Sequence, residues 1–536
     1  MGFVFSRPAA AAALPIALPT LIIRNLTITP LELKLVERLE PHAHHHPHGT
    51  RSLVKVPSQP DDRQEESHEP EAPLPSAPSD NEHVPAKHEL TGVTIAPFSE
   101  CHSPVYTPDP AHHEQLRLTF EDTSTGHRYH AEIPALSKRS IVLKPDPENE
   151  EGETKEFTAV YLPQHAYLAL MSSANLSSWM STLDPSLPLS SLSIPGTHNS
   201  PTCYVALPSV RCQAVSVLDQ LNNGVRFLDV RVSCPPYNPP SPTTKHTDNE
   251  TKATASSPAK PELSLVHSAF PISLTGPKYL STLLATVHDF LAANPSETIL
   301  LSLKREGTGR GTDADLSRIL HAHYTTTTTH DANTDTSTGT TTKWYTSPKI
   351  PTLAQCRGRI VLVRRFVLAP TVPATSGGID GSVWPDNVAD GTCGSGTIRI
   401  QDYYGVGSGR EIPNKVRFAQ EGLERAAQGV HVRVAKGNLP DGGPSSKMLP
   451  LYINFLSASN FFNASCWPDR IAVRINPSMI EYLCMGHGVP KKGAGELDII
   501  GDAATGIVVT DWVGHHGDWD LVRCIVGWNA RLQLRQ

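Results

Sequence analysis

Residues that can move a proton or carry a charge stand at the ends of short apolar segments in the middle of the chain. His198 follows Ile-Pro-Gly-Thr, Asp229 and Arg231 close Val-Arg-Phe-Leu-Asp-Val-Arg, and His267 follows Leu-Val. Apolar segments need burial, whereas His, Asp and Arg resist burial unless they have partners. We therefore expect three strands whose ends meet in one polar pocket.

The residue types in this pocket indicate a definite chemistry. Two histidines can act as general base and general acid when they are held on opposite sides of a reacting phosphorus. Arg231 supplies a permanent charge for the oxygens of a phosphate. Asp229 and Asp511 could orient the imidazoles and stabilise their charged forms. These residues together predict cleavage of a phosphodiester without a metal ion.

The elements that must position these residues alternate between strand and helix. Eight segments are predicted as strands: 189–194, 225–228, 263–266, 298–303, 360–363, 398–400, 451–456 and 507–509. Helical spacing of apolar residues predicts helices over 211–222, 280–291, 414–427 and 477–484. Eight is the strand number of a closed (β/α) barrel, whose active site lies at the carboxyl ends of the strands.

Polar residues follow the later predicted strands as well. They are Lys304, Arg364, Arg365, Asp402, Tyr404 and Asp511. Because successive side chains of a strand point to opposite faces, Arg364 and Arg365 cannot both point into a barrel. Packing alone rarely gives such residues at seven of eight strand ends, so they indicate an active site.

The N-terminal third has a different pattern. Residues 20–165 contain short alternating segments, and we interpret them as a small all-β, sandwich-like domain with a disordered loop at 41–87, after a disordered leader at 1–19. The barrel is predicted to occupy 176–536, with disordered polar insertions at 235–260 and 308–343.

Composition excludes several classes of function. The chain of 536 residues has a formal net charge of -7 and only 18% charged residues, so no basic face indicates a nucleic-acid partner. Its apolar runs are shorter than the roughly 18 residues that span a bilayer, which predicts a soluble or peripheral membrane protein. Nine cysteines without a CxxC pair argue against structural zinc.

Two interpretations of the N-terminus stay open, a secretory leader and N-myristoylation. A cytoplasmic location is favoured over secretion.

A series of motifs resembles one family in order along the chain. The motifs are Ile-Pro-Gly-Thr-His198-Asn-Ser, Gly-Val-Arg-Phe-Leu-Asp229-Val-Arg231, Leu-Val-His267, Asn294-Pro-Ser-Glu-Thr-Ile-Leu-Leu-Ser-Leu-Lys304-Arg-Glu, Arg357-Gly-Arg-Ile-Val-Leu-Val-Arg-Arg-Phe366, Ile400-Gln-Asp-Tyr-Tyr404, Tyr452-Ile-Asn-Phe455 and Val508-Val-Thr-Asp511-Trp512. Over roughly 178–530, apart from the insertions, this series resembles the X domain of phosphatidylinositol-specific phospholipase C in its bacterial form. The resemblance implies a distorted TIM barrel.

The resemblance also implies roles for single residues. His198 would deprotonate the inositol 2-hydroxyl, Arg231 would stabilise the pentavalent phosphorus, and His267 would protonate the departing diacylglycerol oxygen, giving inositol 1,2-cyclic phosphate. Asp511 would support His198. The residues expected to hold inositol hydroxyls are Lys304, Arg365, Asp402 and Tyr404. Arg231 and Lys304 stand where calcium-dependent relatives carry acidic ligands, so no metal and no cofactor are expected.

One residue departs from the family pattern. Bacterial members often carry an aspartate directly after the first histidine, where this chain has Asn199. An asparagine can accept a hydrogen bond from His267 but cannot stabilise an imidazolium by charge. General acid catalysis would then be weaker, or Asp229 would compensate.

The expected partner is phosphatidylinositol or a glycosylated relative, met at a membrane surface. Side chains that could anchor the protein there are Tyr204, Val205, Leu207, Phe461, Phe462 and Trp467; burial under the insertions is the alternative. Two other functions stay open. One is a catalytically impaired barrel that acts as a lipid-binding or scaffold module, and the other is a phosphodiesterase for a different phosphodiester.

Overall fold

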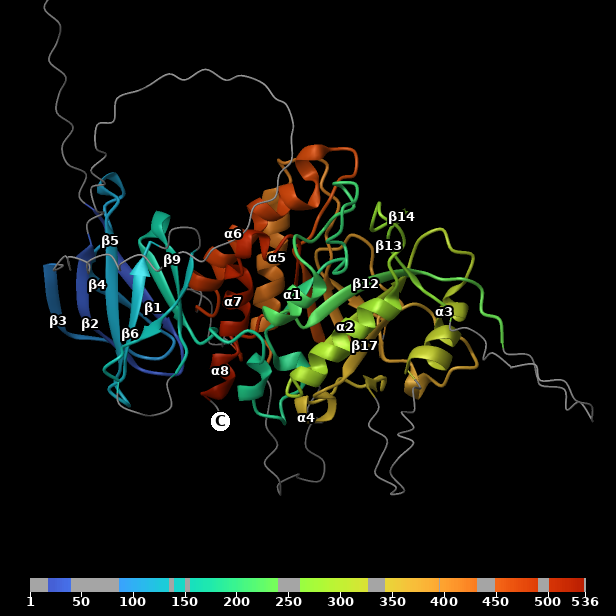
Figure 1. Cartoon of the computed structure of the whole chain (residues 1–536), viewed down its shortest axis with the longest axis horizontal. Coiled ribbons are helices and arrows are strands. Elements are labelled where there is room, and N and C mark those ends of the chain that lie inside the picture. Colours follow the sequence, from blue (N-terminus) through green and yellow to red (C-terminus); the bar gives the residue numbers. More distant parts are fainter. Residues whose placement is uncertain are drawn as a thin grey trace, which may run out of the picture.

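The chain folds into an all-strand part and a larger part in which strands and helices alternate (Figure 1). The computed structural model describes residues 18–39, 86–134, 139–149, 155–239, 261–325, 343–394, 396–430, 449–489 and 501–534. Nearly all of the predicted leader 1–19 and loop 41–87, most of the predicted insertion 235–260, and 17 of the 36 residues of the predicted insertion 308–343 lie outside these residues.

Two five-stranded sheets build the N-terminal part, with the strand orders β4-β1-β10-β9-β7 and β3-β2-β5-β6-β8. The strands are β1 (Thr20–Leu26), β2 (Leu31–Leu39), β3 (Ala86–Ile95), β4 (Ser99–Tyr106), β5 (Gln115–Asp122), β6 (Arg128–Ile133), β7 (Ser140–Val142), β8 (Lys144–Pro145), β9 (Thr158–Leu162) and β10 (Tyr167–Met171). Alternate side chains from both sheets form one core that contains Leu21, Ile23, Leu31, Leu33 and Phe120. This alternation lets two sheets share a buried layer.

Strand β10 lies beyond residue 165, where the all-β part was predicted to end. It pairs in parallel with β1, with Ile22 opposite Tyr167. Its sequence Tyr-Leu-Ala-Leu-Met lacks the alternation of a half-buried strand because both faces are covered. Leu168 and Leu170 pack in the core between the sheets, and Met171 packs on the other side against helices.

The larger part is α/β. Seven parallel strands run in the order β17-β15-β12-β11-β22-β21-β20. Strands that are consecutive in this parallel set therefore lie side by side, except for β17 and β20 at its two ends, and the first strand, β11, lies beside the last, β22. They are β11 (Ile194–Thr197), β12 (Phe227–Ser233), β15 (Ile299–Arg305), β17 (Ile360–Arg365), β20 (Ile398–Gln401), β21 (Leu451–Phe455) and β22 (Ile507–Thr510). Short strands flank them at β16 (Trp344–Tyr345), β18 (Ile379–Asp380) and β19 (Gly391–Cys393). The helices are α1 (Val217–Asn222), α2 (Leu280–Ala293), α3 (Asp313–Leu320), α4 (Leu353–Cys356), α5 (Ile412–Ala427), α6 (Pro468–Met485), α7 (Asp520–Gly527) and α8 (Ala530–Gln533).

One of the eight predicted strands does not belong to this parallel set. The segment predicted at 263–266 forms β13 (Ser264–His267), which pairs antiparallel with the end of β12 and with β14 (Phe270–Pro271). The chain reverses at Ser268, whose φ of 54° is left-handed. Apolar runs of four residues do not reveal strand direction, so the antiparallel pairing could not be predicted. The first predicted strand is also shifted, because 189–191 is a 3-10 turn.

Helix α3 lies inside the segment 308–343 that was predicted to be disordered. Thr312 and Asp315 form a capping box in which each side chain accepts a hydrogen bond from the other residue's backbone N–H. Leu316, Ile319 and Leu320 then give the helix a buried apolar face. The prediction was wrong here because the polar, threonine-rich surroundings hid this short amphipathic pattern.

The two parts share a packed boundary formed by α6 and α7, which lie between the N-terminal sheets and the rest of the molecule in Figure 1. Arg24 of β1 crosses this boundary. It donates to the carbonyl oxygens of Cys484 (2.9 Å) and His487 (3.0 Å), and its guanidinium lies 5.6 Å from the ring centroid of Trp528. Within the described residues, no helix has both the length and the apolar character needed to cross a membrane.

Candidate active site

His198 and Asp511 are brought together by two neighbouring strands. In the parallel pair β11 and β22, Thr197 lies opposite Thr510, so the next residue of each strand emerges at the same edge. His198 Nδ1 lies 3.0 Å from Asp511 Oδ1. Gln213 fixes the arrangement, because its Nε2 donates to the carbonyl oxygens of His198 (2.7 Å) and Thr510 (3.0 Å).

This pairing sets the state of the His198 ring. Burial lowers the pKa of His198, but the Asp511 carboxylate and Cys212 outweigh burial and raise it above the ordinary value. On the opposite side of the ring, Nε2 lies 3.1 Å from Arg231 Nη2 and 3.1 Å from Asn199 Nδ2. Guanidinium and amide N–H groups donate, so these two contacts need a lone pair on Nε2 and oppose the protonation that the raised pKa favours. A general base needs this lone pair.

Three cations stand side by side on adjacent strands. Arg231 of β12 lies opposite Lys304 of β15, and Lys304 lies opposite Arg365 of β17. All three line one cavity of about 430 Å³ together with both histidines. Arg364 is turned away from this cavity, since it binds the carbonyls of Gly377 and Phe366 and pairs with Asp380. The row of cations makes the cavity suitable for an anionic group.

Two carboxylates hold the row in place. Asp229 is fully buried and lies 3.3 Å from nitrogens of both Arg231 and Arg365. Burial raises the pKa of Asp229, but the two guanidinium groups outweigh burial and hold it well below its usual range. Glu306 lies 3.1 Å from Arg231 Nη1 and 2.7 Å from Lys304 Nζ. Asp229 thus contacts guanidinium groups, and not an imidazole as the sequence analysis expected.

The arginines keep donors free for a ligand. Among the described residues, the buried Nε atoms of Arg231 and Arg365 have no hydrogen-bond partner. Buried donors are almost always satisfied in proteins, and those that are not call for an explanation. A bound phosphate group would supply the missing acceptors.

His267 reaches the same cavity from the β13–β14 hairpin. Its ring is nearly perpendicular to that of His198, with 5.8 Å between the ring centroids. Nδ1 donates to the carbonyl oxygen of Val210 at 2.8 Å, which leaves Nε2 as the nitrogen free for the cavity. Asn199 adopts a left-handed φ of 41°, and its buried Oδ1 has no partner among the described residues.

The far wall of the cavity contains the residues predicted to hold inositol hydroxyls. Asp402 Oδ2 accepts from Trp384 Nε1 at 2.9 Å, and the Tyr404 hydroxyl donates to Asp386 Oδ1 at 2.7 Å. The Trp384 ring also lies 3.7 Å below the Arg365 guanidinium. A broad aromatic face beside fixed carboxylates suits a polyhydroxylated ring, which needs both acceptors and a flat apolar surface.

A buried network supports this wall from below. Gln401 Oε1 accepts from the backbone N–H of Tyr403 (2.7 Å) and from Lys415 Nζ (3.0 Å). Gln401 Nε2 donates to Asn454 Oδ1 at 2.8 Å, which ties β20 to β21. Burial lowers the pKa of Lys415 to about 7, although Asp402 and Asp511 act in the opposite direction.

The structure therefore gathers the predicted residues at one edge of the sheet. Of the ten, His198, His267, Arg231, Lys304, Arg365, Asp402 and Tyr404 line the cavity, and Asp511, Asp229 and Asn199 contact them from behind. Sequence reasoning missed Glu306, Trp384 and Cys212. Glu306 had a signal, because a residue two positions after Lys304 on a strand shares its face; Cys212 lies in a loop and had none.

Ligand spacing for a metal occurs once in the part of the chain that the structure describes, at His198, Cys212 and His267, whose ligand atoms lie within 4.8 Å of one another. The Arg231 guanidinium, 3.1 Å from His198 Nε2, would repel a cation at this point. His267 Nδ1 is already bound to Val210. The donor set therefore does not fit a resident metal.

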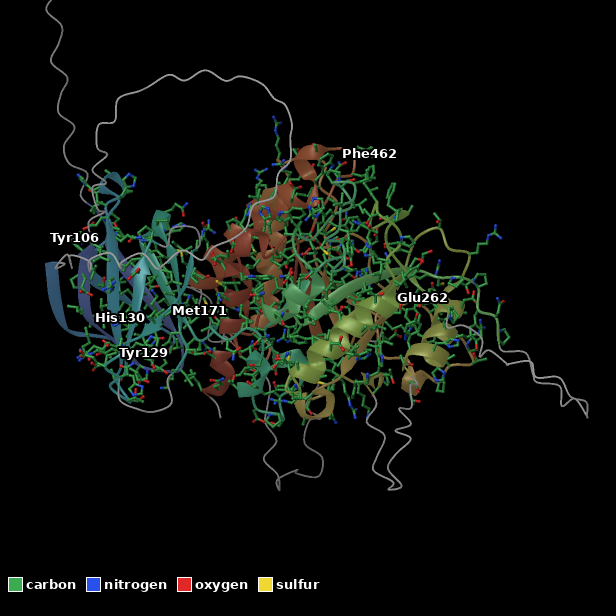
Figure 2. All side chains as sticks on the ribbon, viewed as in Figure 1. Tyr106, Tyr129, His130, Met171, Glu262 and Phe462 are labelled. Carbon is green, nitrogen blue, oxygen red and sulfur yellow. The ribbon has the colours of Figure 1, made fainter. Side chains whose placement is uncertain are left out.

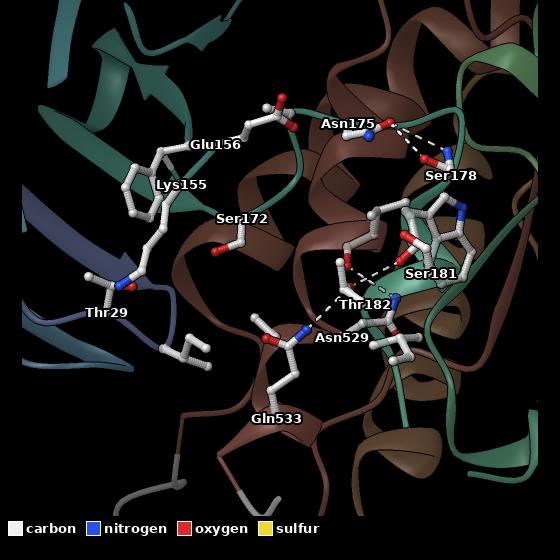
Figure 3. A pocket seen from close by; sticks show the side chains of 17 residues that line it. Thr29, Lys155, Glu156, Ser172, Asn175, Ser178, Ser181, Thr182, Asn529 and Gln533 are labelled. Atoms are coloured by element: carbon white, nitrogen blue, oxygen red, sulfur yellow. Dashed lines mark hydrogen bonds between the residues drawn. The ribbon is translucent and has the colours of Figure 1, made fainter. Parts of the chain in front are cut away.

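A second cavity of about 410 Å³ lies between the N-terminal sheets and the C-terminal helices (Figure 3). Eight of its 17 lining residues carry hydroxyl or amide groups, among them Asn175, Asn529 and Gln533. Of the two charged lining residues, Lys155 is paired with Asp122 at 2.7 Å. This cavity lacks the acid, base and anion-binding groups of the first.

Known proteins are similar to this chain over a segment that supplies part of the cavity. The family "Phosphatidylinositol-specific phospholipase C, X domain" matches residues 185–366. A 1-phosphatidylinositol phosphodiesterase of Listeria monocytogenes is 29% identical over 204 residues, 36% of this chain and 50% of the relative. The chain thus spans half the length of that relative. A Staphylococcus aureus protein of the same name is 24% identical over 350 residues, 63% of this chain and 88% of the relative.

Solved structures of phosphatidylinositol-specific phospholipases C are similar at lower identity. A Staphylococcus aureus double mutant has 23% identity and a TM-score of 0.46, covering 66% of this chain and 97% of that one. The Listeria monocytogenes structure has 21% identity and a TM-score of 0.41, covering 66% and 99%. Residues 185–366 include both histidines and the whole row of cations. The match to the phosphatidylinositol-specific phospholipase C X domain thus covers the part of the chain that supplies both histidines and the three cations.

Proposed function

We propose that this protein cleaves phosphatidylinositol, or a glycosylated relative, to diacylglycerol and inositol 1,2-cyclic phosphate. The observation that carries the proposal is the pair of perpendicular histidines, 5.8 Å apart, on a cavity that also contains the Arg231 guanidinium. Acid–base chemistry at phosphorus needs this combination of a base, an acid and a fixed positive charge.

The reaction consists of one exchange at phosphorus. His198 Nε2 takes the proton of the inositol 2-hydroxyl, and that oxygen forms a bond to phosphorus. Arg231 stabilises the negative charge that builds on the phosphoryl oxygens. The bond between phosphorus and the glycerol oxygen then breaks, and His267 Nε2 gives its proton to that oxygen. The proton gained by one histidine balances the proton lost by the other.

The remaining residues hold the reactants. Asp511 keeps the His198 proton on Nδ1 and stabilises the ring when it becomes charged. Lys304, Arg365, Asp402 and Tyr404 bind inositol hydroxyls around the Trp384 face. We also propose that the activity does not depend on calcium, because the positive charges of Arg231 and Lys304 would repel a divalent ion in the cavity.

We also propose a fold for each of the two parts of the chain. The order of the seven parallel strands supports a distorted TIM barrel. In this barrel β13, which pairs antiparallel with β12, does not take the place of a parallel barrel strand. The separate core of the N-terminal sheets supports a β-sandwich domain, with the barrel occupying the rest of the chain from about residue 176.

An exposed aromatic cluster supports peripheral membrane binding. Phe270 stacks on Phe461 with 5.3 Å between the ring centroids, and Phe461 contacts Phe462 at the same distance. Phe462 is 95% exposed and lies at the outer edge of the molecule in Figure 2. Phe270 is three residues from His267 and Phe461 is two residues from Ser459, and both His267 and Ser459 line the cavity. Exposed aromatic rings insert readily into the headgroup region of a bilayer.

The test uses phosphatidylinositol vesicles and follows the release of diacylglycerol. We expect turnover by the wild type and none by His198→Ala or His267→Ala. Phe461→Ser/Phe462→Ser should lose vesicle binding but keep cleavage of a soluble inositol phosphodiester, whereas Val142→Ser, on the exposed β7 surface, should change neither. Vesicle binding without turnover would favour a lipid-binding module. Cleavage of glycerophosphodiesters in preference to phosphatidylinositol would favour a different phosphodiesterase.

A further inference from the structure

We propose that Cys212 is a positioning residue for His267, and that its thiolate supplies the negative charge that Asn199 cannot give to the His267 imidazolium. The inference rests on the proposed function, in which His267 is the general acid. It deepens that function by assigning a residue that the family resemblance does not include.

The Cys212 side chain lies directly behind the His267 ring. Its Sγ is 3.7 Å from His267 Nδ1, 3.5 Å from the Val210 carbonyl oxygen and 3.9 Å from Asn199 Nδ2. The residue is completely buried. Its backbone is held on both sides, because its N–H donates to Thr202 Oγ1 (3.0 Å) and its carbonyl accepts from Trp512 N–H (2.9 Å).

The acidic side chains around the cavity are engaged elsewhere. Asp511 pairs with His198, Asp229 with the two arginines, and Glu306 with Arg231, Lys304 and the backbone N–H of Ser268. Asp402 and Asp386 bind Trp384 and Tyr404. Among the described residues, Cys212 is therefore the ionisable side chain within reach of Nδ1 of His267 that can become an anion.

The hydrogen bond to Val210 decides where the ring protons sit. A carbonyl oxygen only accepts, so Nδ1 of His267 carries a hydrogen in both protonation states. When the Cys212 thiol gives up its proton and the ring gains one, the second ring proton is therefore on Nε2. Nε2 is the nitrogen that must protonate the leaving oxygen, so the thiolate favours the state that acts as the acid.

The electrostatics of the pocket favour this pair. Burial raises the pKa of Cys212, but His267 and His198 outweigh burial and bring it down to about 7, against an opposing effect of Asp511. The positive Arg231, which contacts His198, acts in the same direction as the histidines. Burial instead raises the pKa of the Cys356 thiol to about 12, because the opposing effects of Arg357 and Arg359 are smaller than that of burial.

The first test compares two leaving groups. Cys212→Ser keeps the shape of the side chain and a donor for Val210, at a slightly smaller volume, but cannot become an anion near neutral pH. We expect about a tenfold loss of kcat on phosphatidylinositol, because the substitution removes the negative charge beside the His267 imidazolium. On inositol 4-nitrophenyl phosphate, whose leaving group needs no proton, the loss should stay below about twofold. Equal losses on both substrates would mean a merely structural role and would overturn the proposal.

The second test needs no activity. The thiolate absorbs near 240 nm, so the difference in absorbance between the wild type and Cys212→Ser, titrated from pH 5 to 9, isolates this thiol. We expect a midpoint near 7 that moves upward in His267→Ala. A midpoint that moves only in His198→Ala would assign the pair to the other histidine and refute the inference.

Controls separate the outcomes. Cys356→Ser is equally buried and also removes a thiol that donates to a backbone carbonyl, and it should leave the titration and the ratio of the two rates unchanged. If the wild type cleaves neither substrate, the proposed function fails, whereas the titration still reports whether Cys212 and His267 are paired. Cys212→Asp, which restores a negative charge, should recover the rate on phosphatidylinositol if it folds, as judged by circular dichroism.

Discussion

Replacing Asp511 by asparagine tests how the base is prepared. The substitution keeps the shape of the side chain but removes the charge 3.0 Å from His198 Nδ1. A hydrogen bond to a charged partner contributes about 1.5–3 kcal/mol, so its loss in the transition state, where the imidazolium forms, predicts about a 10- to 150-fold fall in kcat.

The neighbouring Gln213 limits the fall in kcat of Asp511→Asn. Gln213 Nε2 lies 3.4 Å from Asp511 Oδ1 and donates toward it, so the amide oxygen of the new asparagine should face His198 and the amide nitrogen should point away. The ring then keeps its hydrogen on Nδ1. Without this bias the asparagine could donate to Nδ1 and force the wrong tautomer, which costs about 10⁴-fold in a related arrangement of catalytic residues. Gln213→Ala combined with Asp511→Asn should therefore lose more than the product of the two single effects.

The pH dependence of kcat in Asp511→Asn tests the role of Asp511 independently. Asp511 raises the pKa of His198, so its neutralisation should lower that pKa and move the acid limb of kcat to lower pH. The relative loss should then be largest at high pH and smaller at low pH. Steady-state kinetics on a soluble inositol phosphodiester between pH 5 and 9 measure both effects, with Asp390→Asn, an exposed partner of Arg399, as the matched control. A loss below about threefold, or an acid limb that does not move, would refute this account of the base.

Two further substitutions probe the charged network. Glu306→Gln leaves the two cations Arg231 and Lys304 without their shared carboxylate. It should therefore lower kcat about 10- to 100-fold and tighten the binding of inorganic phosphate. An unchanged phosphate affinity in calorimetry would contradict this expectation. Burial raises the pKa of Glu306, but these cations outweigh burial and lower it to about 2, so its stabilising effect should be present above about pH 4.5 and be lost as the pH falls toward 2. Glu297→Ala should reduce the free energy of unfolding by about 3–5 kcal/mol, since it leaves the fully buried Arg226 unpaired; urea unfolding measures this loss, and a change below about 1 kcal/mol would show that water or relaxation compensates.

Much of the site follows from local sequence and from the rules of parallel sheets. Residues at the ends of neighbouring parallel strands must meet, which predicts that His198 and Asp511 converge although 313 positions separate them. Alternation along a strand predicts that one of Arg364 and Arg365 points inward, and Arg365 does. These predictions need only strand positions and register, which apolar runs reveal.

Features that depend on long loops and on covered surfaces could not be predicted. Cys212 reaches His267 only through the path of the loop after β11, which no spacing encodes. Trp384 likewise lies between strands, and its place under Arg365 depends on tertiary packing. The direction of β13 and the strand character of β10 escaped because short or fully covered strands lack the two-residue period.

The most direct test of the central claim is phosphorus NMR of phosphatidylinositol vesicles incubated with the full chain in excess EDTA. We expect the resonance of a five-membered cyclic phosphate at an undiminished rate with the wild type, and none with His198→Ala or His267→Ala. Product that forms only after calcium is added would contradict the roles given to Arg231 and Lys304.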